Sequence, residues 1–462
     1  MTSPLPVRQV LTELPGPRAR AVIERGAFDL QTLYRTVIFD EERSVGTRLI
    51  DVDGNCFLDL FSSFALGSLG YNHPAVLAVT RSDAFARAAA QPTSTPFLTS
   101  EVWIRFVEQV QARWAPRHMA RMFCVDSGSE GVEHALKVAF IHHGEARRRR
   151  VGQPANPLEL SAEEQARVLD GVLSSDAVVV SFAGAFHGRG LGPLSATHSK
   201  VIHKADLPAF PWPVVPFPAN RWPLERYAEE NARLEAASLA ALQRVMEAHR
   251  GRVAAILVEP IQCEGGDRHA SPAFFQAVQR VAREHECSLV LDEVQTGVAI
   301  SGSMWLHEQL GVLPDLMPFG KKMQMGGFFA TAERDIRQFG RMYQTRNGDR
   351  TRAMVAGAVL EECERLLPQI REVGAYFLAR LVELGERFPA LVSEPRGRGL
   401  LISFDLPTVA ARDDFLRRAL RQGVFATYTG ARSVRLRPHL ITTRTEVDEA
   451  MDVFFAVCKE MA

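Results

Sequence analysis

The stretch SLVLDEVQTG, residues 288–297, decides the fold class, because an apolar run passes directly into acidic and glycine-containing chain. Similar runs are DAVVVSFAG (176–184), AAILVEPI (254–261) and DLMPFG (315–320), and helical patterns such as FFQAVQRVAREH lie between some of them. Near-continuous apolar strands that alternate with helices are typical of a parallel sheet covered on both faces. The sequence therefore predicts an α/β fold with a mainly parallel sheet.

The C-terminal part has a different character. After about residue 350 we expect two long helices, the glycine-rich segment EPRGRGLLISFDLP, another helix and the strand SVRLRPHL. This pattern predicts a smaller α+β domain after the large one. We place the boundaries at residues 1–75 for an N-terminal segment, 76–345 for the large domain and 346–462 for the small domain.

Composition excludes several classes of function. The chain has 54 basic and 54 acidic residues, so no global field favours nucleic acid or an anionic membrane. The N-terminus lacks an apolar signal region, and no apolar run approaches membrane-spanning length. The six cysteines are scattered without a C-x-x-C pair, so we expect no metal site and a reducing, cytoplasmic location.

Polar residues at the predicted strand ends are the candidates for chemistry, because ligands of open α/β sheets bind at the carboxyl ends of the strands. Asp292 and Glu293 follow one strand, although a carboxylate that caps the next turn is the alternative. VDSGSEGVEHALK (125–137) leads from a strand into a helix at Gly128 and Ser129. Such a helix start binds anions, and a simple capping box is the competing interpretation.

Two further strand ends carry groups that suit a flat, anionic ligand. In GAFHGRGLG (184–192), Phe186 can stack on a ring and Arg189 can hold a carboxylate in bidentate fashion. EPIQCEGGDRH (259–269) adds Glu264 and other polar residues. In the small domain, Arg437 lies within the apolar VRLRPHL, where a half-buried guanidinium requires an anion.

The segment FGKKMQMGG (319–327) sets Lys321 and Lys322 side by side at another strand end. A lysine that is desolvated in a crevice has a lowered pKa and can form a Schiff base with a carbonyl. A phosphate cradle, a stacking aromatic residue, a carboxylate for a ring nitrogen and such a lysine together describe a pyridoxal 5'-phosphate site.

These segments resemble the class III aminotransferases of fold type I, and within them the L-lysine 6-aminotransferases (lysine ε-aminotransferases). The resemblance runs from about residue 45 to the C-terminus. DEVQTG and GAFHGR are similar to the broad class, whereas EGGDRH and the doubled lysine of FGKK are similar to the lysine enzymes. The resemblance implies a seven-stranded sheet in the large domain and an N-terminal segment that joins the small domain and the active-site wall.

The resemblance also implies roles around the cofactor. Lys321 would bond to the cofactor and move the proton, while Lys322 points the other way and is structural or solvated. Thr345, in QTRNGD, would reach the phosphate of a neighbouring subunit, although Arg346, Asn347 and Asp349 depart from the family pattern. The remaining cofactor contacts implied are Gly128 and Ser129 at the phosphate, Phe186 and His187 at the ring, Asp292 at the ring nitrogen and Gln295 at the ring hydroxyl.

For the substrates, the resemblance assigns Arg189 to the α-carboxylate of L-lysine and Arg437 to 2-oxoglutarate. Glu264 would neutralise Arg437 while lysine is bound, and Phe64 would form a pocket wall or simply pack in the core. The implied reaction moves the ε-amino group of L-lysine to 2-oxoglutarate and yields 2-aminoadipate 6-semialdehyde and L-glutamate. The resemblance further implies a homodimer with shared active sites.

Three alternatives stay open at this point. The first is another ω-aminotransferase that acts on ornithine, 4-aminobutyrate, a diamine or a biosynthetic amine. The second is an aminomutase or decarboxylase on the same fold. The third is a regulator that binds the cofactor without turnover, which the presence of the lysine, Asp292 and Gln295 disfavours.

Overall fold

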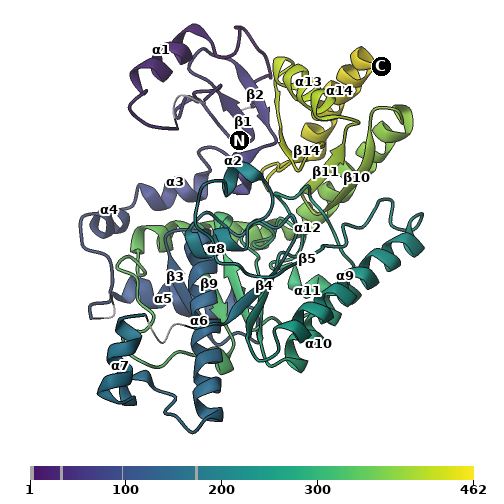
Figure 1. Ribbon diagram of the computed structural model, residues 1–462. Coiled ribbons are helices and arrows are strands. Elements are labelled where there is room, and N and C mark those ends of the chain that lie inside the picture. Colours follow the sequence, from purple (N-terminus) through teal and green to yellow (C-terminus); the bar gives the residue numbers. More distant parts are fainter. Residues whose placement is uncertain (1–4, 32–34, 96, 172–174) are drawn as a thin grey trace. The chain divides into compact units, whose positions relative to one another are not determined.

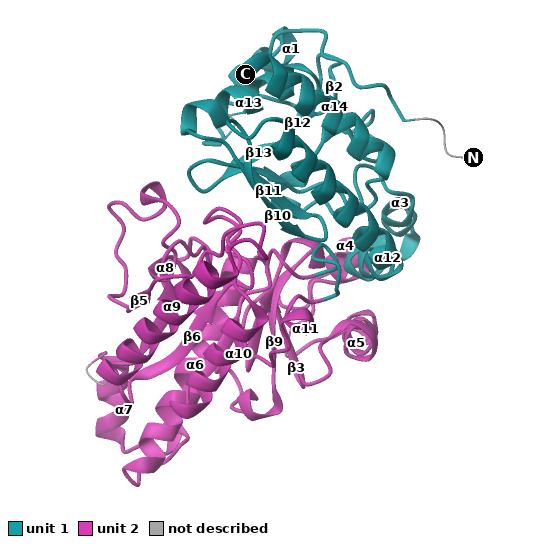
Figure 2. Ribbon diagram, turned by 90° about the vertical axis from the view of Figure 1, so that its right-hand side faces the viewer, with its two compact units in different colours: residues 1–87, 298–304, 355–462 teal, residues 88–297, 305–354 magenta. Residues whose placement is uncertain are grey.

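The computed structural model describes residues 5–31, 35–95, 97–171 and 175–462. The chain forms two compact units, which Figure 2 colours separately. Unit 1 comprises Met1–Arg87, Val298–Met304 and Val355–Ala462, and unit 2 comprises Ala88–Gly297 and Trp305–Met354. The division into domains at residues 75/76 and 345/346 stays a prediction.

Unit 2 is built around a seven-stranded sheet, and this confirms the predicted fold class. The first strand, β3, and the second, β9, pair in antiparallel fashion, as do β9 and β8, whereas the remaining neighbours are parallel. In spatial order the strands are β3 (Arg121–Val125), β9 (Gly326–Ala330), β8 (Leu316–Phe319), β7 (Ser288–Leu291), β6 (Val253–Val258), β4 (Val178–Phe182) and β5 (Val214–Val215).

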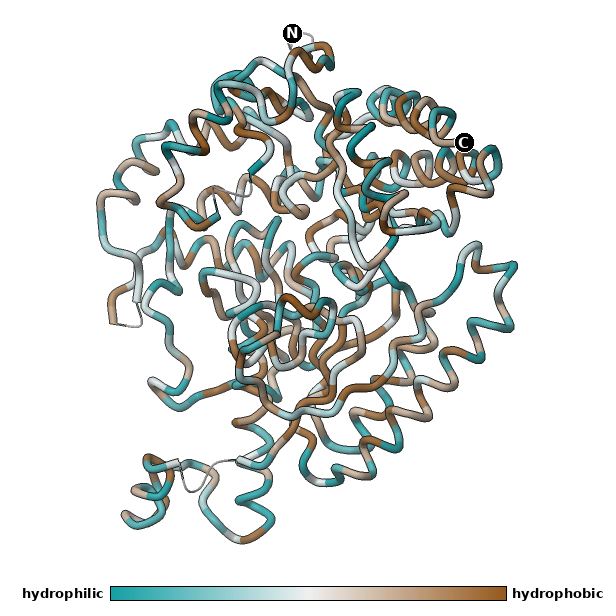
Figure 3. The backbone as a smooth tube through the Cα atoms, turned by 45° about the horizontal axis from the view of Figure 1, so that its top comes forward, coloured by the Kyte–Doolittle hydropathy of each residue, from teal (hydrophilic) through white to brown (hydrophobic). Residues whose placement is uncertain are grey.

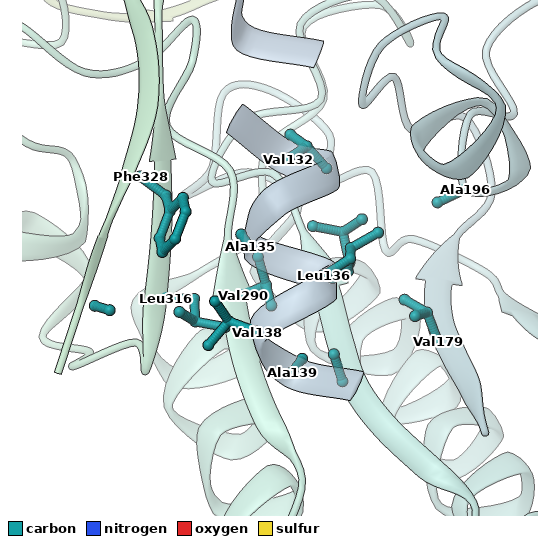
Figure 4. Packing of buried hydrophobic residues seen from close by; sticks show 13 residues of the cluster. Val132, Ala135, Leu136, Val138, Ala139, Val179, Ala196, Val290, Leu316 and Phe328 are labelled. Atoms are coloured by element: carbon teal, nitrogen blue, oxygen red, sulfur yellow. The ribbon is translucent and has the colours of Figure 1, made fainter. Parts of the chain in front are cut away.

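Both faces of this sheet are buried. Val290 of β7 packs with Val132 and Leu136 of the long helix α6 (Gly128–Arg150), as Figure 4 shows. Successive strand residues point to opposite faces, and Leu289 and Leu291 on the other face are also only 1% exposed. This explains why the strands read as continuous apolar runs rather than as alternating ones.

Helix α10 (Pro272–Glu284) is amphipathic, because Phe274, Val278 and Val281 are buried on one side of it. Figure 3 shows how hydrophobic and hydrophilic residues alternate along the chain. Ser127, Ser100 and Ser271 each begin a helix by accepting a hydrogen bond from an amide of the first turn. Besides α6, the helical segments are α5 (Glu101–Gln109), the π-helix Val110–Trp114, α7 (Ala162–Leu169), α8 (Leu191–Ser195), α9 (Ala228–Ala248), α10 (Pro272–Glu284) and α11 (His307–Leu310), with short 3-10 turns at Pro157–Glu159, Val201–His203, Lys321–Met323 and Ala332–Arg334.

Unit 1 contains two smaller sheets, and Figure 1 labels several of their strands and the helices of the unit. The three-stranded sheet has the order β1 (Arg48–Ile50), β2 (Cys56–Asp59) and β12 (Val424–Phe425). The four-stranded sheet has the order β10 (Ser393–Arg398), β11 (Leu401–Asp405), β14 (Ser433–Leu436) and β13 (Thr427–Thr429). The helices are α1 (Pro17–Arg25), α2 (Ser62–Ala65), α3 (Pro74–Thr80), α13 (Val409–Arg421) and α14 (Arg444–Met461), while α4 (Asp83–Ala89) and α12 (Arg350–Arg387) each begin in one unit and end in the other.

The prediction of two long helices after residue 350 is wrong, because α12 runs unbroken over 38 residues with Pro368 inside it. Proline lacks an amide hydrogen and normally kinks or ends a helix. Here the neighbouring Leu366 and Ile370 are 4% and 0% exposed, so their burial on either side of the proline outweighs its local cost. Within the described part of the chain, no helix combines the length and the apolar character needed to cross a membrane.

Candidate active site

Six strands of unit 2 run in the same direction and end at the same edge of the sheet. β4, β5, β6, β7 and β8 are parallel, and β3 shares their direction because both β3 and β8 are antiparallel to β9. The residues that follow these carboxyl ends include nine of the predicted site residues: Gly128, Ser129, Phe186, His187, Arg189, Glu264, Asp292, Gln295 and Lys321.

The two adjacent lysines have different environments. Lys322 is 1% exposed, and its Nζ donates to the backbone carbonyl of Gln295 at 3.0 Å. Lys321 is only partly buried and has a φ of 48°, in the left-handed region that residues other than glycine seldom adopt. Such an outlier at a strand end suggests a functional constraint. Lys322 is therefore structural rather than solvated, and the catalytic role of Lys321 stays a prediction.

The strand-end carboxylates of Asp292 and Glu293 have different partners. Asp292 is 5% exposed, and its Oδ2 lies 2.8 Å from Nδ1 of His187, which is itself buried. Glu293 turns to the protein interior, where its carboxylate accepts from the amides of Leu306 at 2.8 Å and His307 at 2.7 Å. Glu293 therefore has a structural task, whereas the contact of Asp292 with a ring nitrogen stays a prediction.

The start of α6 is a capping box that also joins a second loop. Ser127 is the N-cap, and Glu130 accepts from its amide, so the competing interpretation of this segment is confirmed. The hydroxyl of Ser129 accepts from the amides of Arg189 and Gly190 at 3.2 and 3.1 Å. The amides of Gly128 and Ser129 lie in the first turn of a 23-residue helix, where the helix dipole favours an anion.

Sequence reasoning missed part of a charged cluster that adjoins Phe186. Nζ of Lys200 lies 2.5 Å from Oε1 of Glu264, and the ring of His203 meets the ring of Phe186 edge-on at 5.3 Å between centroids. Burial lowers the pKa of His203, and the positive charges of Arg189 and Lys200 lower it further. Lys200 and His203 were missed because they follow β4 at a distance, in THSKVIH, and not at the strand end itself.

The other predicted residues lie elsewhere. Thr345 is exposed on unit 2, and its neighbour Gln344 donates to Glu130 at 3.5 Å. Arg437 belongs to unit 1, where it is fully buried, and two of its guanidinium contacts are the carbonyls of Leu436 and Ile402 at 2.9 and 3.4 Å. The pairing of Glu264 with Arg437 stays a prediction, as do the roles of Thr345 and Gln295.

Phe64 is held by an unusual turn of unit 1. All four residues of α2, from Ser62 to Ala65, have positive φ values between 41° and 65°, so this segment is a left-handed turn. Asp59 accepts from the amide of Ser62 at 2.9 Å, and the Ser62 hydroxyl donates to the carbonyl of Arg437 at 2.6 Å. Phe64 is 49% exposed, which excludes ordinary core packing, and its role as a pocket wall stays a prediction.

The strand-end residues of unit 2 fit pyridoxal 5'-phosphate. A buried carboxylate can accept from a ring N–H, and Asp292 uses Oδ1 for the amide of Val294 and Oδ2 for His187, which leaves further lone pairs. The chain beside the lysine packs closely against the start of α6, because a Cβ on Gly320 would lie 3.1 Å from Cα of Gly128. Among the described residues, no group of three or more histidine, cysteine, aspartate or glutamate side chains is arranged to hold a metal ion.

Comparison with known proteins agrees with this geometry. The family model of the class III aminotransferases matches residues 31–458. The chain is 34% identical over 457 residues to 4-aminobutyrate aminotransferase of Dictyostelium discoideum, covering 98% of this chain and 91% of that protein. It is 36% identical to the mitochondrial 4-aminobutyrate aminotransferase of Homo sapiens, with 93% and 86% coverage. Among solved structures, lysine aminotransferase from M. tuberculosis superposes with a TM-score of 0.87 at 32% identity and covers 96% of this chain and 100% of that one.

The fold and the site define a pyridoxal-phosphate enzyme, and the chain belongs to the class III aminotransferases. Its activity is the transfer of an amino group from a small-molecule donor to an oxo acid, with pyridoxal 5'-phosphate as cofactor. The lysine specificity implied by the resemblance does not follow from these comparisons, because the curated relatives named above use 4-aminobutyrate.

Proposed function

We propose that this enzyme transfers the terminal amino group of an ω-amino acid to 2-oxoglutarate, with 4-aminobutyrate as the preferred donor. The observation that carries the proposal is the cluster formed by Arg189, Lys200, His203 and Glu264 beside Phe186. Its charges suit a donor whose distal group is a carboxylate alone.

The proposal requires a binding site for the donor carboxylate. Arg189 is exposed beside the start of α6, and a guanidinium binds a carboxylate through two parallel hydrogen bonds. Lys200 is a second cation of the same cluster, and both lower the pKa of His203. A donor carboxylate near Arg189 would therefore lie in a region of positive potential.

L-Lysine and ornithine carry an α-ammonium group, which 4-aminobutyrate lacks. That group would lie next to the donor carboxylate, hence close to the cations Arg189 and Lys200. Glu264, the acidic member of the cluster, already lies 2.5 Å from Lys200. Like charges brought together in a partly buried site are unfavourable, so this arrangement discriminates against an α-ammonium group.

L-Lysine remains the second candidate donor. The structural similarity to lysine aminotransferase from M. tuberculosis favours it, as do the segments EGGDRH and FGKK. For lysine to bind, Glu264 would have to leave Lys200 and accept from the α-ammonium group instead. The products would then be 2-aminoadipate 6-semialdehyde and L-glutamate.

The proposed division of labour follows from the geometry of unit 2. When bound, pyridoxal 5'-phosphate supplies an electron sink for the carbon that loses its proton. The amine of Lys321 removes that proton and returns it as general acid in the following step. Asp292 keeps a proton on the ring nitrogen by its negative charge, and His187, 2.8 Å away, holds the carboxylate in place. Phe186 would cover one face of the ring.

We further propose a homodimer in a reducing, cytoplasmic compartment. Phe97, Leu98 and Phe339 expose 80%, 66% and 76% of their surface on unit 2, and the rings of Phe97 and Phe339 pack at 5.4 Å. An apolar group of this kind supports contact with a second copy. All six cysteines are buried free thiols, which suits a reducing environment.

Matched donor pairs test the choice of donor. 4-Aminobutyrate is compared with 2,4-diaminobutyrate, and 6-aminohexanoate with L-lysine, because the members of each pair differ only by the α-ammonium group. We expect kcat/KM to be at least about tenfold higher for the member without it, which corresponds to about 1.4 kcal/mol. A preference for L-lysine over 6-aminohexanoate would refute the 4-aminobutyrate assignment and support the second candidate.

The variant Lys200→Met shows whether the cluster causes the discrimination. It removes one cation and leaves Glu264 to accept from an α-ammonium group, so the preference within each pair should narrow. Lys204→Met is the matched control, because Lys204 follows in the same segment and donates to the carbonyl of Ser195 at 2.9 Å. An unchanged ratio in Lys200→Met would mean that the discrimination arises elsewhere.

A further inference from the structure

Glu259 is a buried carboxyl group for which the reaction described above gives no task. It follows β6 directly and is only 6% exposed. Its Oε1 accepts from the amide of Phe186 at 2.8 Å, and its Oε2 accepts from the amide of Cys263 at 3.3 Å. One side chain thus joins the loop after β4, which bears Phe186, to the loop after β6, which leads to Glu264.

We propose that Glu259 is a positioning residue that fixes the backbone of Phe186 and thereby the place of the Phe186 ring over the cofactor. The ring itself meets His203 edge-on, so Phe186 is held at both its main chain and its side chain. This task lies beyond the choice of donor, and it rests on the proposed place of the Phe186 ring over the cofactor.

The surroundings of Glu259 favour its protonated, neutral form. Burial raises the pKa of Glu259 well above its ordinary value, and the nearby negative charge of Asp292 raises it further, with a smaller contribution from Glu264. The bonds to the two amides oppose this shift without reversing it. A protonated Glu259 can still accept from the amide of Phe186, and it adds no second negative charge beside Asp292. Asp292 then remains the carboxylate whose charge acts on the ring nitrogen.

This inference has two parts: Glu259 holds the amide of Phe186, and it does so in its neutral form. The substitutions Glu259→Gln and Glu259→Ala distinguish them. Glutamine is uncharged and keeps an oxygen for the amide of Phe186, so Glu259→Gln should bind pyridoxal 5'-phosphate within about threefold of the wild type. Alanine removes the acceptor, and Glu259→Ala should lose tenfold or more in cofactor affinity and at least half of the visible circular dichroism of the bound cofactor. Circular dichroism reports how the ring is held, independently of turnover.

Controls separate positioning from general stability. Glu145 is also 6% exposed in unit 2, where it accepts from Gln338 and Arg341, and Glu145→Ala should leave the affinity and the dichroism of the cofactor unchanged. Phe186→Ala should resemble Glu259→Ala, and the double variant should lose no more than either single one, because both act through the same ring.

Several results would overturn the proposal. If Glu259→Ala holds the cofactor with the affinity and dichroism of the wild type, Glu259 does not position Phe186. If the losses in the double variant add, Glu259 acts by a route other than Phe186. If Glu259→Gln loses as much as Glu259→Ala, the neutral form is not the acting one. Should Glu259→Ala fail to fold, Glu259→Asp serves in its place, because its shorter side chain cannot reach the amide of Phe186.

Discussion

Substitutions of the adjacent lysines should separate activity from stability. Lys322 donates to the carbonyl of Gln295 and is 1% exposed, whereas Lys321 is partly exposed. Lys322→Ala removes the donor, leaves a buried carbonyl without it and deletes packed methylene groups. An unpaired buried polar group costs about 1–3 kcal/mol, and the lost packing adds to this. We expect a loss of about 2–4 kcal/mol in the free energy of unfolding.

The size of the thermal shift follows from that loss. For a unit of this size each kcal/mol corresponds to roughly 2–4 °C, so Lys322→Ala should lower the Tm by about 4–16 °C. Lys322→Met keeps most of the apolar stem, so its smaller deficit measures the amine–carbonyl bond alone. Lys321→Ala should change the Tm by about 1 °C or less. The Tm is measured without cofactor, because bound cofactor stabilises the folded state by mass action.

The effects on transamination should have the opposite order, so that substitution of Lys321 reduces the activity more than substitution of Lys322. Lys321→Ala should lose at least about 10³-fold in kcat, since the proton-transferring amine is gone. Lys322→Met should keep its activity within about tenfold, because the strand end remains folded. If Lys322→Met lost activity at an unchanged Tm while Lys321→Ala still turned over, the assignment of the two lysines would be reversed.

Three further predictions concern local features. Ser63 has a φ of 52°, so Ser63→Gly should raise the Tm by about 1–3 °C relative to Ser63→Ala, whereas a right-handed helix would show the reverse order. Burial and the charge of Lys204 lower the pKa of His198 to about 4, so the folded state binds its proton less readily than the unfolded state and stability is lost as the pH falls from about 6.5 toward 4. His198→Gln should flatten that dependence in Tm scans at pH 7.5 and 5, and an unchanged slope would exclude His198 as its source. Phe97→Ser combined with Phe339→Ser should weaken self-association at least tenfold in sedimentation experiments, and an unaltered dimer would place the interface elsewhere.

Much of the fold was predictable because its strands are buried on both faces. Continuous apolar runs such as SLVL indicate strands that are buried on both faces. Each of the four runs used for the prediction forms a strand of the large sheet. β9 was missed because GGFFA begins with two glycines, which normally weaken a strand. Gly327 is nevertheless required there, since a Cβ on it would lie 2.3 Å from the carbonyl oxygen of Phe123.

The left-handed turn at Ser62–Ala65 could not be predicted from local sequence. Left-handed backbone is expected at glycine, and none of these four residues is glycine. The conformation costs roughly 1–2 kcal/mol per residue, and it persists because distant partners over-determine it. Asp59 binds the amide of Ser62, and the hydroxyl of the same serine binds the carbonyl of Arg437, 375 residues further along the chain. A prediction that uses only a short window of the sequence cannot detect such distant partners.

At the site, the positions of residues after the strands predicted the cofactor more readily than the amino donor. A parallel sheet brings the residues after its strands to one edge, so Asp292, Lys321 and the start of α6 were found without knowledge of side-chain contacts. The same rule could not tell that Asp292 faces His187 whereas Glu293 caps Leu306 and His307. Consecutive residues diverge at a strand end, and only tertiary partners decide which of them enters the site.

Donor choice rests on residues that no strand positions directly. All donors of this class present the same amino group to the same cofactor, so in the proposed mechanism Asp292 and Lys321 serve every donor alike. Donors differ at their distal group, which we propose is recognised by the loops that carry Arg189, Lys200 and Glu264. Identities of 34% and 36% to 4-aminobutyrate aminotransferases and 32% to a lysine aminotransferase are too similar to decide between them. We therefore expect substitutions at Lys200 and Glu264 to change the ratio between donors, and substitutions at Asp292 and Lys321 to reduce turnover of all donors by the same factor.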